Sequence, residues 1–293
     1  MTPYHYDYAV IGGDLRQAYL ALELTKSGGA VCSFALCQPA QTNAVKTFSS
    51  LEAAVSNSAC IVCPVPFTKD GVNLNQKAMK GNLNINQFLK NLKPAQRLYA
   101  GCIPDDFYQK ASKMSIILFD FMKEESLSYF NSIATAEGVI CEAIKNSPVN
   151  LSGSKCAVFG YGKCGRTLAE KLLRLSCHVT VISADATERA QASVFAEQTL
   201  SLKDAAFPIG TFDFIFNTIP SIVLTKELLE KTKNSVTILD IASSPGGIDL
   251  TAAKELSLNA ASYPGLPGRY APLSSAKAIN ESIKKFERRS LCL

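Results

Sequence analysis

Long apolar runs are missing from this 293-residue sequence, and so is a basic N-terminal region. A bilayer-spanning helix needs ~18 consecutive apolar residues, whereas the segment 115–122 is short and is interrupted by Asp120. A secretory signal begins with basic residues, whereas residues 1–13 lead directly into a predicted strand. We therefore expect a soluble cytoplasmic protein that does not enter a membrane.

Histidine is scarce, and the cysteines form no metal-ligand pattern. Two histidines, His5 and His178, accompany ten cysteines. The single CxxC pair, Cys60 and Cys63, falls in a predicted buried strand, where residues three apart face opposite sides and lie ~10 Å apart, too far for a disulfide. We expect small buried thiols in a reducing compartment and no metal site.

A strong excess of either charge is also missing. Lysine and arginine number 30 against 25 acidic residues, which gives a net charge of +5. The basic residues are dispersed, so nucleic acid is not expected as a partner, while the mild excess suits a small anionic substrate. A hydrophobic fraction of 47% is typical of a folded protein, and the length suggests two domains.

Short apolar runs alternate with helical patterns along the chain. Strands are predicted at 7–13, 30–36, 59–65, 97–101 and 115–121, and again at 156–160, 178–183, 212–219, 236–243 and 260–263. Helical patterns separate them, so each series indicates a parallel sheet with crossover helices. The predicted fold class is α/β, with two Rossmann-like, doubly wound parallel-sheet domains.

A glycine-rich motif lies between a predicted strand and a predicted helix of the second series. Gly160, Gly162 and Gly165 form GxGxxG in the context that this motif requires. The first glycine permits a tight turn, the second lets the backbone approach a pyrophosphate, and the third lets helix and strand pack closely. The helix N-terminus adds N–H donors. We predict a dinucleotide site to which the intervening residues also contribute: Tyr161, Lys163 and Cys164.

The acidic residue that grips the ribose 2′-hydroxyl in many dinucleotide sites, ~20 residues after the motif, is missing here. Ser183 ends the predicted strand, and Asp185 follows it too late. Ser183, Thr187 and Arg189 are predicted to donate hydrogen bonds to a 2′-phosphate, which favours NADP over NAD. NAD stays possible if Asp185 turns toward the ribose. Contacts to the ribose and nicotinamide are predicted for the loops after later strands, at Thr218, Ile219, Pro220, Ala242 and Ser243.

Two domains are expected. The first is an N-terminal substrate or partner domain over 1–125, joined by the C-terminal helix 272–293. The second, over 126–271, comprises a long hinge helix, which Pro148 ends, and the NAD(P)-binding unit. Ligands bind at the carboxyl ends of the strands in such sheets, so we expect the functional cleft between the domains.

The first predicted strand also leads into a helix through a glycine turn. Its two glycines, Gly12 and Gly13, are adjacent and lack the GxGxxG spacing, so a second dinucleotide is not expected there. Arg16 and Gln17 at the start of this helix suit a carboxylate of a small substrate. An ordinary strand–helix turn with a surface arginine is the alternative.

The two-domain plan invites comparison with D-2-hydroxyacid dehydrogenases, which use a histidine acid/base and an arginine clamp on the cofactor domain. Ser243 and Ser244 stand where that family places its arginine, and the segment 263–272 holds no histidine. His5 and His178 are not well placed. Ketone–alcohol chemistry with a histidine base is therefore not expected.

Six segments follow one another as in the A subunits of bacterial dipicolinate synthase: VIGGDLRQ, YFNSIATAEGVICEAI, AVFGYGKCGRTLA, FNTIPSIVL, LDIASSPGGID and PGLPGRYAP. The chain resembles that family over essentially its whole length. The resemblance implies a cytoplasmic enzyme in the mother cell of a sporulating bacterium. It also implies that a flavoprotein-like B subunit takes part in oxidising dihydrodipicolinate to dipicolinate. One departure is Ser244, where relatives carry arginine.

The implied reaction fits the scarcity of histidine. Aromatising a dihydropyridine dicarboxylate removes a hydride and a proton, and no alcohol has to be deprotonated. Glu137 is the predicted proton acceptor, with a surface or capping role as its alternative, and Arg16 is the other catalytic candidate. The two substrate carboxylates are predicted to meet these donors: Arg16, Gln17, Asn131, Ser132, Thr135 and Arg269.

Two other functions stay open from the sequence. The chain is alternatively a non-catalytic, nucleotide-binding scaffold for a flavoprotein partner, since its acid/base residues are few. A further alternative is an NAD(P)-dependent dehydrogenase of another small carboxylate. Assembly into a homo-oligomer is compatible with either.

Overall fold

The computed structural model describes residues 4–37, 44–204, 206 and 208–291. The chain separates into two compact units. The first unit comprises residues 1–130 together with 271–293, and the second comprises residues 131–270. The boundary falls within a long helix, α5 (Glu125–Asn146), where the sequence predicts one, and Pro148 follows its end.

The first unit is built on a six-stranded parallel sheet of order β3-β2-β1-β4-β5-β6. Its strands are β1 (Tyr6–Ile11), β2 (Val31–Phe34), β3 (Lys46–Thr47), β4 (Ser58–Val62), β5 (Arg97–Ala100) and β6 (Ile117–Asp120). Its helices are α1 (Leu15–Lys26), α2 (Leu51–Ser56), α3 (Ile85–Asn91), α4 (Asp105–Lys113), the 3-10 turn η1 (Phe121–Lys123) and α11 (Pro272–Leu291).

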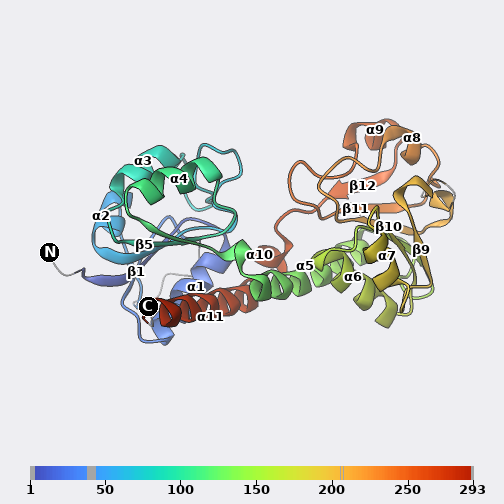
Figure 1. Cartoon of the computed structure of the whole chain (residues 1–293). Coiled ribbons are helices and arrows are strands. Elements are labelled where there is room, and N and C mark those ends of the chain that lie inside the picture. The colour runs from blue at the N-terminus through green and yellow to red at the C-terminus, as the bar shows by residue number, and fades with distance from the viewer. Residues whose placement is uncertain (1–3, 38–43, 205, 207, 292–293) are drawn as a thin grey trace. The chain divides into compact units, whose positions relative to one another are not determined.

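Helices cover both faces of this sheet (Figure 1). Successive residues of a strand point to opposite faces, so Ile11 packs toward α2, α3 and α4, whereas Val10 packs toward α1 and α11. The C-terminal helix α11 lies against α1, with Ile279 and Ile283 buried. Burial of each such side chain contributes roughly 1.5–3 kcal/mol, which fixes α11 to the N-terminal sheet.

The second unit repeats the plan, with a parallel sheet of order β12-β11-β10-β7-β8-β9. Its strands are β7 (Lys155–Phe159), β8 (His178–Ile182), β9 (Gln198–Leu200), β10 (Phe214–Asn217), β11 (Thr237–Asp240) and β12 (Asn259–Ser262). Its helices are α6 (Lys163–Arg174), α7 (Ala186–Ala192), α8 (Lys226–Leu229), α9 (Leu250–Glu255) and α10 (Leu266–Tyr270), with 3-10 turns η2 (Leu202–Asp204) and η3 (Ile209–Thr211).

The second sheet is also buried on both faces. Val158 and Phe216 pack toward α5 and α6, whereas Phe159 and Ile215 pack toward α8 and α9. This two-sided burial explains why the strands read as nearly continuous apolar runs in the sequence. The strand order reverses beside β1 in the first unit and beside β7 in the second, and ligands bind at such reversals in doubly wound sheets.

The predicted fold class is confirmed, since both sheets are parallel and doubly wound. Among the described residues, no helix combines the length and apolarity that crossing a bilayer requires. Within the same ranges, no group of three or more His, Cys, Asp or Glu side chains is placed to hold a metal ion. His178 begins β8, and its Nδ1 lies 2.9 Å from Oε2 of the exposed Glu197.

Candidate functional site

The glycine-rich loop joins β7 to α6 at the point where the strand order of the second sheet reverses. Gly160 has φ +88°, a left-handed conformation that favours glycine. A Cβ on Gly165 would collide with the carbonyl oxygen of Gly160, so helix and strand approach at backbone distance. Gly162 differs, because a Cβ there would meet no atom within 4 Å. The turn and packing roles predicted for the motif therefore correspond to the geometry.

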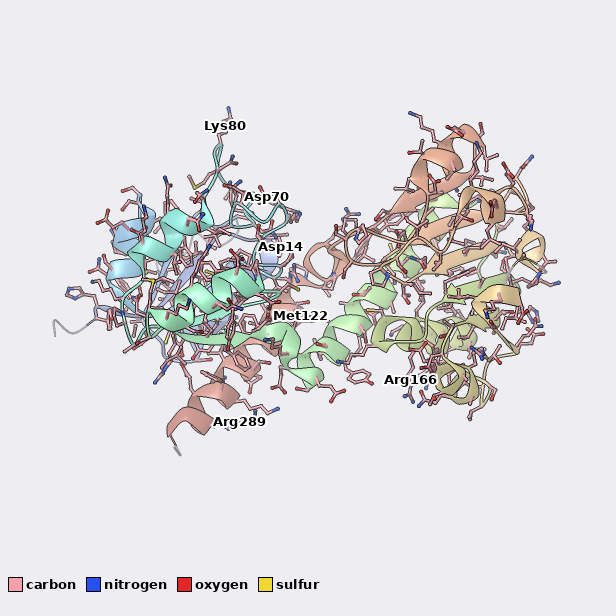
Figure 2. All side chains as sticks on the ribbon, turned by 45° about the horizontal axis from the view of Figure 1, so that its top comes forward. Asp14, Asp70, Lys80, Met122, Arg166 and Arg289 are labelled. Carbon is pink, nitrogen blue, oxygen red and sulfur yellow. The ribbon has the colours of Figure 1, made fainter. Side chains whose placement is uncertain are left out.

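A dinucleotide pyrophosphate fits this loop. Among the described residues, no side chain caps the N-terminus of α6, where Gly162 is the N-cap residue. The N–H groups of the first helical turn lack intrahelical partners, and together with the helix dipole they attract phosphate. The open space at Gly162 gives the phosphate access to them. Arg166, labelled in Figure 2, lies one turn farther along α6 and is exposed.

The loops after β10 and β11 are joined by a buried polar pair, Asn217 and Asp240. Nδ2 of Asn217 donates to Oδ1 of Asp240 at 2.9 Å. The Asp240 carboxylate also accepts from the backbone N–H groups of Ala242, at 3.0 Å, and Gly247, at 2.9 Å. Thr218 donates through its hydroxyl to the carbonyl of Phe159, at 2.9 Å. The sequence did not identify Asn217 or Asp240, which hold the predicted cofactor loops in place.

At the end of β8, the three predicted phosphate donors already have protein partners. Ser183 donates through its hydroxyl to the carboxylate of Glu188 at 2.5 Å. Arg189 donates through Nη1 to the carbonyls of Ser183 and Ala184, both at 2.8 Å. The backbone N–H of Thr187 donates to Asp185 at 2.6 Å. Their predicted contact with a 2′-phosphate would therefore require these bonds to be exchanged.

Glu188 was not identified from the sequence, although a local signal was present. In the stretch Asp185–Ala186–Thr187–Glu188, an N-cap residue is followed by glutamate at the third helical position, which is typical of a capping box. The pattern predicts the start of α7. It does not predict where the Glu188 side chain goes.

The predicted substrate residues on α5 lie against the start of α6. Ser132 shares a hydrogen bond with Thr167, with 2.7 Å between the hydroxyl oxygens. Thr135 forms a hydrogen bond with the thiol of Cys164, whose pKa is nevertheless raised by burial. Asn131 is buried, and its Oδ1 has no partner among the described residues. Ser132 and Thr135 thus connect α5 to α6, whereas Asn131 keeps an unsatisfied acceptor.

Glu137 and Arg269 are each held in an ion pair. Glu137 accepts from Nζ of Lys171 at 2.9 Å, and Lys171 stands roughly 12 Å along α6 from the glycine loop. Arg269 donates to the nearly buried Glu142 at 3.0 Å, and Glu142 also accepts from the hydroxyl of Tyr270. The structure therefore does not bring Glu137 to the glycine loop. Its role as a proton acceptor stays a prediction, as does that of Arg269 as a carboxylate ligand.

In the first unit, Arg16 and Gln17 are both buried in the first turn of α1. The Arg16 guanidinium donates to the carboxylate of Asp14 at 2.8 Å and to the carbonyl of Val65 at 2.5 Å. Asp14, labelled in Figure 2, is also the N-cap of α1. Both polar side-chain atoms of Gln17 are buried and have no partner among the described residues. Gln17 therefore has the unsatisfied donor of the predicted pair.

The Asp14–Arg16 pair makes the stability of the first unit depend on pH. Burial alone would raise the pKa of Asp14, but the hydrogen bonds and charge of Arg16 lower it below the ordinary value. A lowered folded-state pKa stabilises the fold above about pH 4 and ceases to do so as the pH falls through that pKa. We expect Asp14→Asn to lose less unfolding free energy than the unsubstituted chain between neutral and acidic pH, in urea denaturation. Asp105→Asn, on the exposed side of α4, is the control, and equal losses in all three chains would contradict this expectation.

Comparison with known proteins identifies relatives over the whole chain. Residues 7–122 match the family model of the N-terminal domain of the dipicolinate synthase A subunit, and residues 148–253 match a model described as NAD(P)-binding. The A subunit of dipicolinate synthase from Bacillus subtilis (strain 168) is 27% identical over 293 residues, which cover 95% of this chain and 94% of that protein. The resemblance inferred from the sequence is thereby confirmed, and the second unit carries an NAD(P)-binding domain.

Solved structures share the fold. The dipicolinate synthase A subunit from Bacillus halodurans superposes with a TM-score of 0.85 at 24% identity, over 96% of this chain and 97% of that one. The corresponding polypeptide of the Bacillus subtilis synthase gives 0.82 at 24% identity, over 99% and 97%. A transhydrogenase from Sinorhizobium meliloti gives 0.66 at 12% identity, over 96% and 92%.

Proposed function

We propose that this chain, a relative of the dipicolinate synthase A subunits, oxidises dihydrodipicolinate to dipicolinate with a nicotinamide dinucleotide as hydride acceptor. The observation that carries the proposal is the glycine loop of the second unit, with its open approach at Gly162 and its uncapped helix start, in a chain matched to such a relative over 95% of its length. The sequence favours NADP as the dinucleotide, and this preference depends on the surroundings of Ser183.

The reaction balances without a strong base. Dihydrodipicolinate loses one hydride from a ring carbon and one proton, and the ring becomes aromatic. The dinucleotide, when bound, supplies the hydride acceptor. The protein has to hold the two carboxylates and keep the ring oriented, and the proton can leave to a carboxylate or to water, since aromatisation favours its loss.

Gln17 and Asn131 are the best-supported substrate contacts among the predicted residues. Each is buried and presents polar atoms without a partner among the described residues. An unsatisfied buried amide costs about 1–3 kcal/mol, so a ligand that satisfies it gains affinity. Gln17 offers an N–H donor for a carboxylate, whereas the unpartnered atom of Asn131 is an acceptor and suits a ring N–H. Arg16 would act indirectly, by fixing the start of α1 against Val65.

Gln17→Leu tests this assignment through opposite effects on stability and on substrate use. Leucine has a similar size and no polar atoms, so the unfolding free energy should rise by about 1–2 kcal/mol. A lost hydrogen bond to a charged carboxylate should raise KM for dihydrodipicolinate by roughly tenfold or more. Thermal unfolding and steady-state kinetics measure the two effects. Gln109→Leu, on the exposed side of α4, is the matched control, and an unchanged KM for Gln17→Leu would contradict the assignment.

A second polypeptide belongs to the proposal. The name of the relatives describes one lettered component of a synthase, so we propose that the chain acts with a flavoprotein-like B subunit, in the mother cell of a sporulating bacterium. The B subunit would use or deliver the product of the same pathway step. Self-association of the chain is compatible with this arrangement.

A non-catalytic scaffold is the second candidate, because the charged acid/base candidates are all engaged. Arg16 is paired with Asp14, Glu137 with Lys171, and Arg269 with Glu142. In that case the partner would carry out the redox step, and the glycine loop of this chain would bind a nucleotide without hydride transfer.

Reconstitution separates the two candidates. Dihydrodipicolinate is generated enzymatically, and dipicolinate is followed by its ultraviolet absorbance. The purified chain is assayed with NAD, with NADP and with neither, each with and without the B subunit. Product from the chain and a dinucleotide alone supports the proposed oxidation. Product that requires the partner and is indifferent to added dinucleotide overturns it in favour of the scaffold.

A further inference from the structure

The end of β8 contains a carboxylate that is held in a defined position by two different elements. Ser183 follows the strand, and Asp185 caps α7 by accepting from the N–H groups of Thr187, at 2.6 Å, and Glu188, at 3.0 Å. Glu188 is therefore the third residue of α7 and faces back toward the strand end. Its Oε2 accepts from the hydroxyl of Ser183 at 2.5 Å and from the backbone N–H of Tyr161 at 3.3 Å.

The contact with Tyr161 ties the carboxylate to the glycine loop itself. Tyr161 is the residue between the first two glycines of the motif, and its side chain is buried against Phe195. Ser183, on the other side of the carboxylate, is also buried. Both contacts are made by Oε2, so they do not engage Oε1 of Glu188. The carboxylate thus lies between the phosphate loop and the end of the next strand.

The capping arrangement explains why Glu188 reaches the loop. In a capping box, a glutamate at the third helical position accepts from the N–H of the N-cap residue. Here that N–H, on Asp185, donates instead to the hydroxyl of Ser183 at 3.1 Å. Glu188 is therefore released from the usual capping contact and accepts from Tyr161.

We propose that Glu188 is the ribose-binding acidic residue of this site and that it selects NAD over NADP. In doubly wound dinucleotide sites an acidic residue at the end of the second strand accepts from the adenosine ribose 2′-hydroxyl. The end of β8 lacks one, and α7 supplies it one helical turn later. Oε1 of Glu188 would accept from the 2′-hydroxyl of NAD. This specificity rests on the proposed binding of a nicotinamide dinucleotide to the second unit, and it reverses the preference inferred from the sequence.

The charges around this position disfavour a 2′-phosphate. Such a group carries between one and two negative charges, as phosphate monoesters do at neutral pH. It would meet the carboxylates of Glu188 and Asp185, which lie on the same turn. The nearest cation, Arg189, donates to the carbonyls of Ser183 and Ala184 and holds the strand end closed. A 2′-phosphate would thus meet like charge where a hydroxyl meets an acceptor.

Calorimetric titration of the full chain tests the proposal without any assay of turnover. The ligands are NAD, NADP, ADP and adenosine 2′,5′-bisphosphate. We expect NAD to bind at least about tenfold more tightly than NADP, and ADP more tightly than the bisphosphate, since one hydrogen bond to a charged group is worth a factor of about ten or more. Glu188→Gln keeps the shape of the side chain and removes its charge, so it should reduce this ratio by about tenfold.

Glu197→Gln is the matched control, because Glu197 is an exposed glutamate of the same unit and pairs with His178. It should leave the ratio unchanged. Tighter binding of NADP, or an equal NAD-to-NADP ratio before and after Glu188→Gln, would overturn the proposal. Absence of binding by all four ligands would overturn it together with the proposed cofactor site. Tighter binding of NAD in a chain that forms no dipicolinate would support it and contradict only the proposed reaction.

Discussion

Gly162→Val is expected to prevent dinucleotide binding while leaving the fold intact. Gly162 has φ −65° and ψ −170°, which any residue adopts, and an added Cβ meets no protein atom within 4 Å. The new side chain would occupy the space through which a pyrophosphate approaches the first turn of α6. Losing two charge-assisted hydrogen bonds costs about 3 kcal/mol or more, so Kd should rise at least about 100-fold. Calorimetric titration measures Kd, and thermal unfolding should give an unchanged Tm.

Two further substitutions frame this result. Ser152→Val lies in an exposed turn that precedes β7, at the opposite end of the strand from the loop, and should affect neither Kd nor Tm. Gly165→Ala places a methyl group against the Gly160 carbonyl and should lower the Tm as well as the affinity. Dinucleotide binding by Gly162→Val with an unchanged Kd would mean that the phosphate lies elsewhere.

Asp240→Ala is expected to produce the largest loss of stability in the second unit. Asp240 is only 2% exposed and accepts hydrogen bonds from Asn217, from the N–H of Ala242 and from the N–H of Gly247. Alanine would leave these three donors without an acceptor. Each unsatisfied buried group costs about 1–3 kcal/mol, so the unfolding free energy should fall by about 3 kcal/mol or more in urea denaturation.

Asp249→Ala provides the comparison. Asp249 caps α9 and accepts from the N–H of Ala252 at 2.9 Å, so its loss should cost about 1 kcal/mol. The loops after β10 and β11 should also lose their fixed positions in Asp240→Ala, which would weaken dinucleotide binding beyond the effect of Asp249→Ala. Equal losses of stability in the two variants would contradict the role assigned to Asp240.

The fold could be predicted from the sequence where the elements are long or fully buried. The strands around Val10, Val158 and Ile238 form apolar runs because helices cover both faces of each sheet. Two edge strands were missed, β3 and β9, which are short and partly or fully exposed. The helix α7 was missed because its sequence ATERAQA contains little apolar periodicity.

The candidate site was predictable only where its chemistry is local. The glycine loop depends on three residues within one turn, so its spacing was sufficient. Ion pairs formed by distant residues, such as Lys171 with Glu137 and Arg269 with Glu142, depend on the tertiary structure, and a sequence does not show that these side chains are already engaged. Glu188 was missed because the search for an acidic residue ended at the strand, whereas the capping geometry of α7 delivers the carboxylate from the next turn.

The most direct test of the proposed function compares two products in one reaction. The purified chain is mixed with dihydrodipicolinate and excess oxidised dinucleotide, without any flavin, and reduced nicotinamide and dipicolinate are measured together over time. The proposed hydride transfer predicts that both appear at the same rate and in a ratio of one to one. Dipicolinate that forms without reduction of the dinucleotide would contradict the proposed function of this chain.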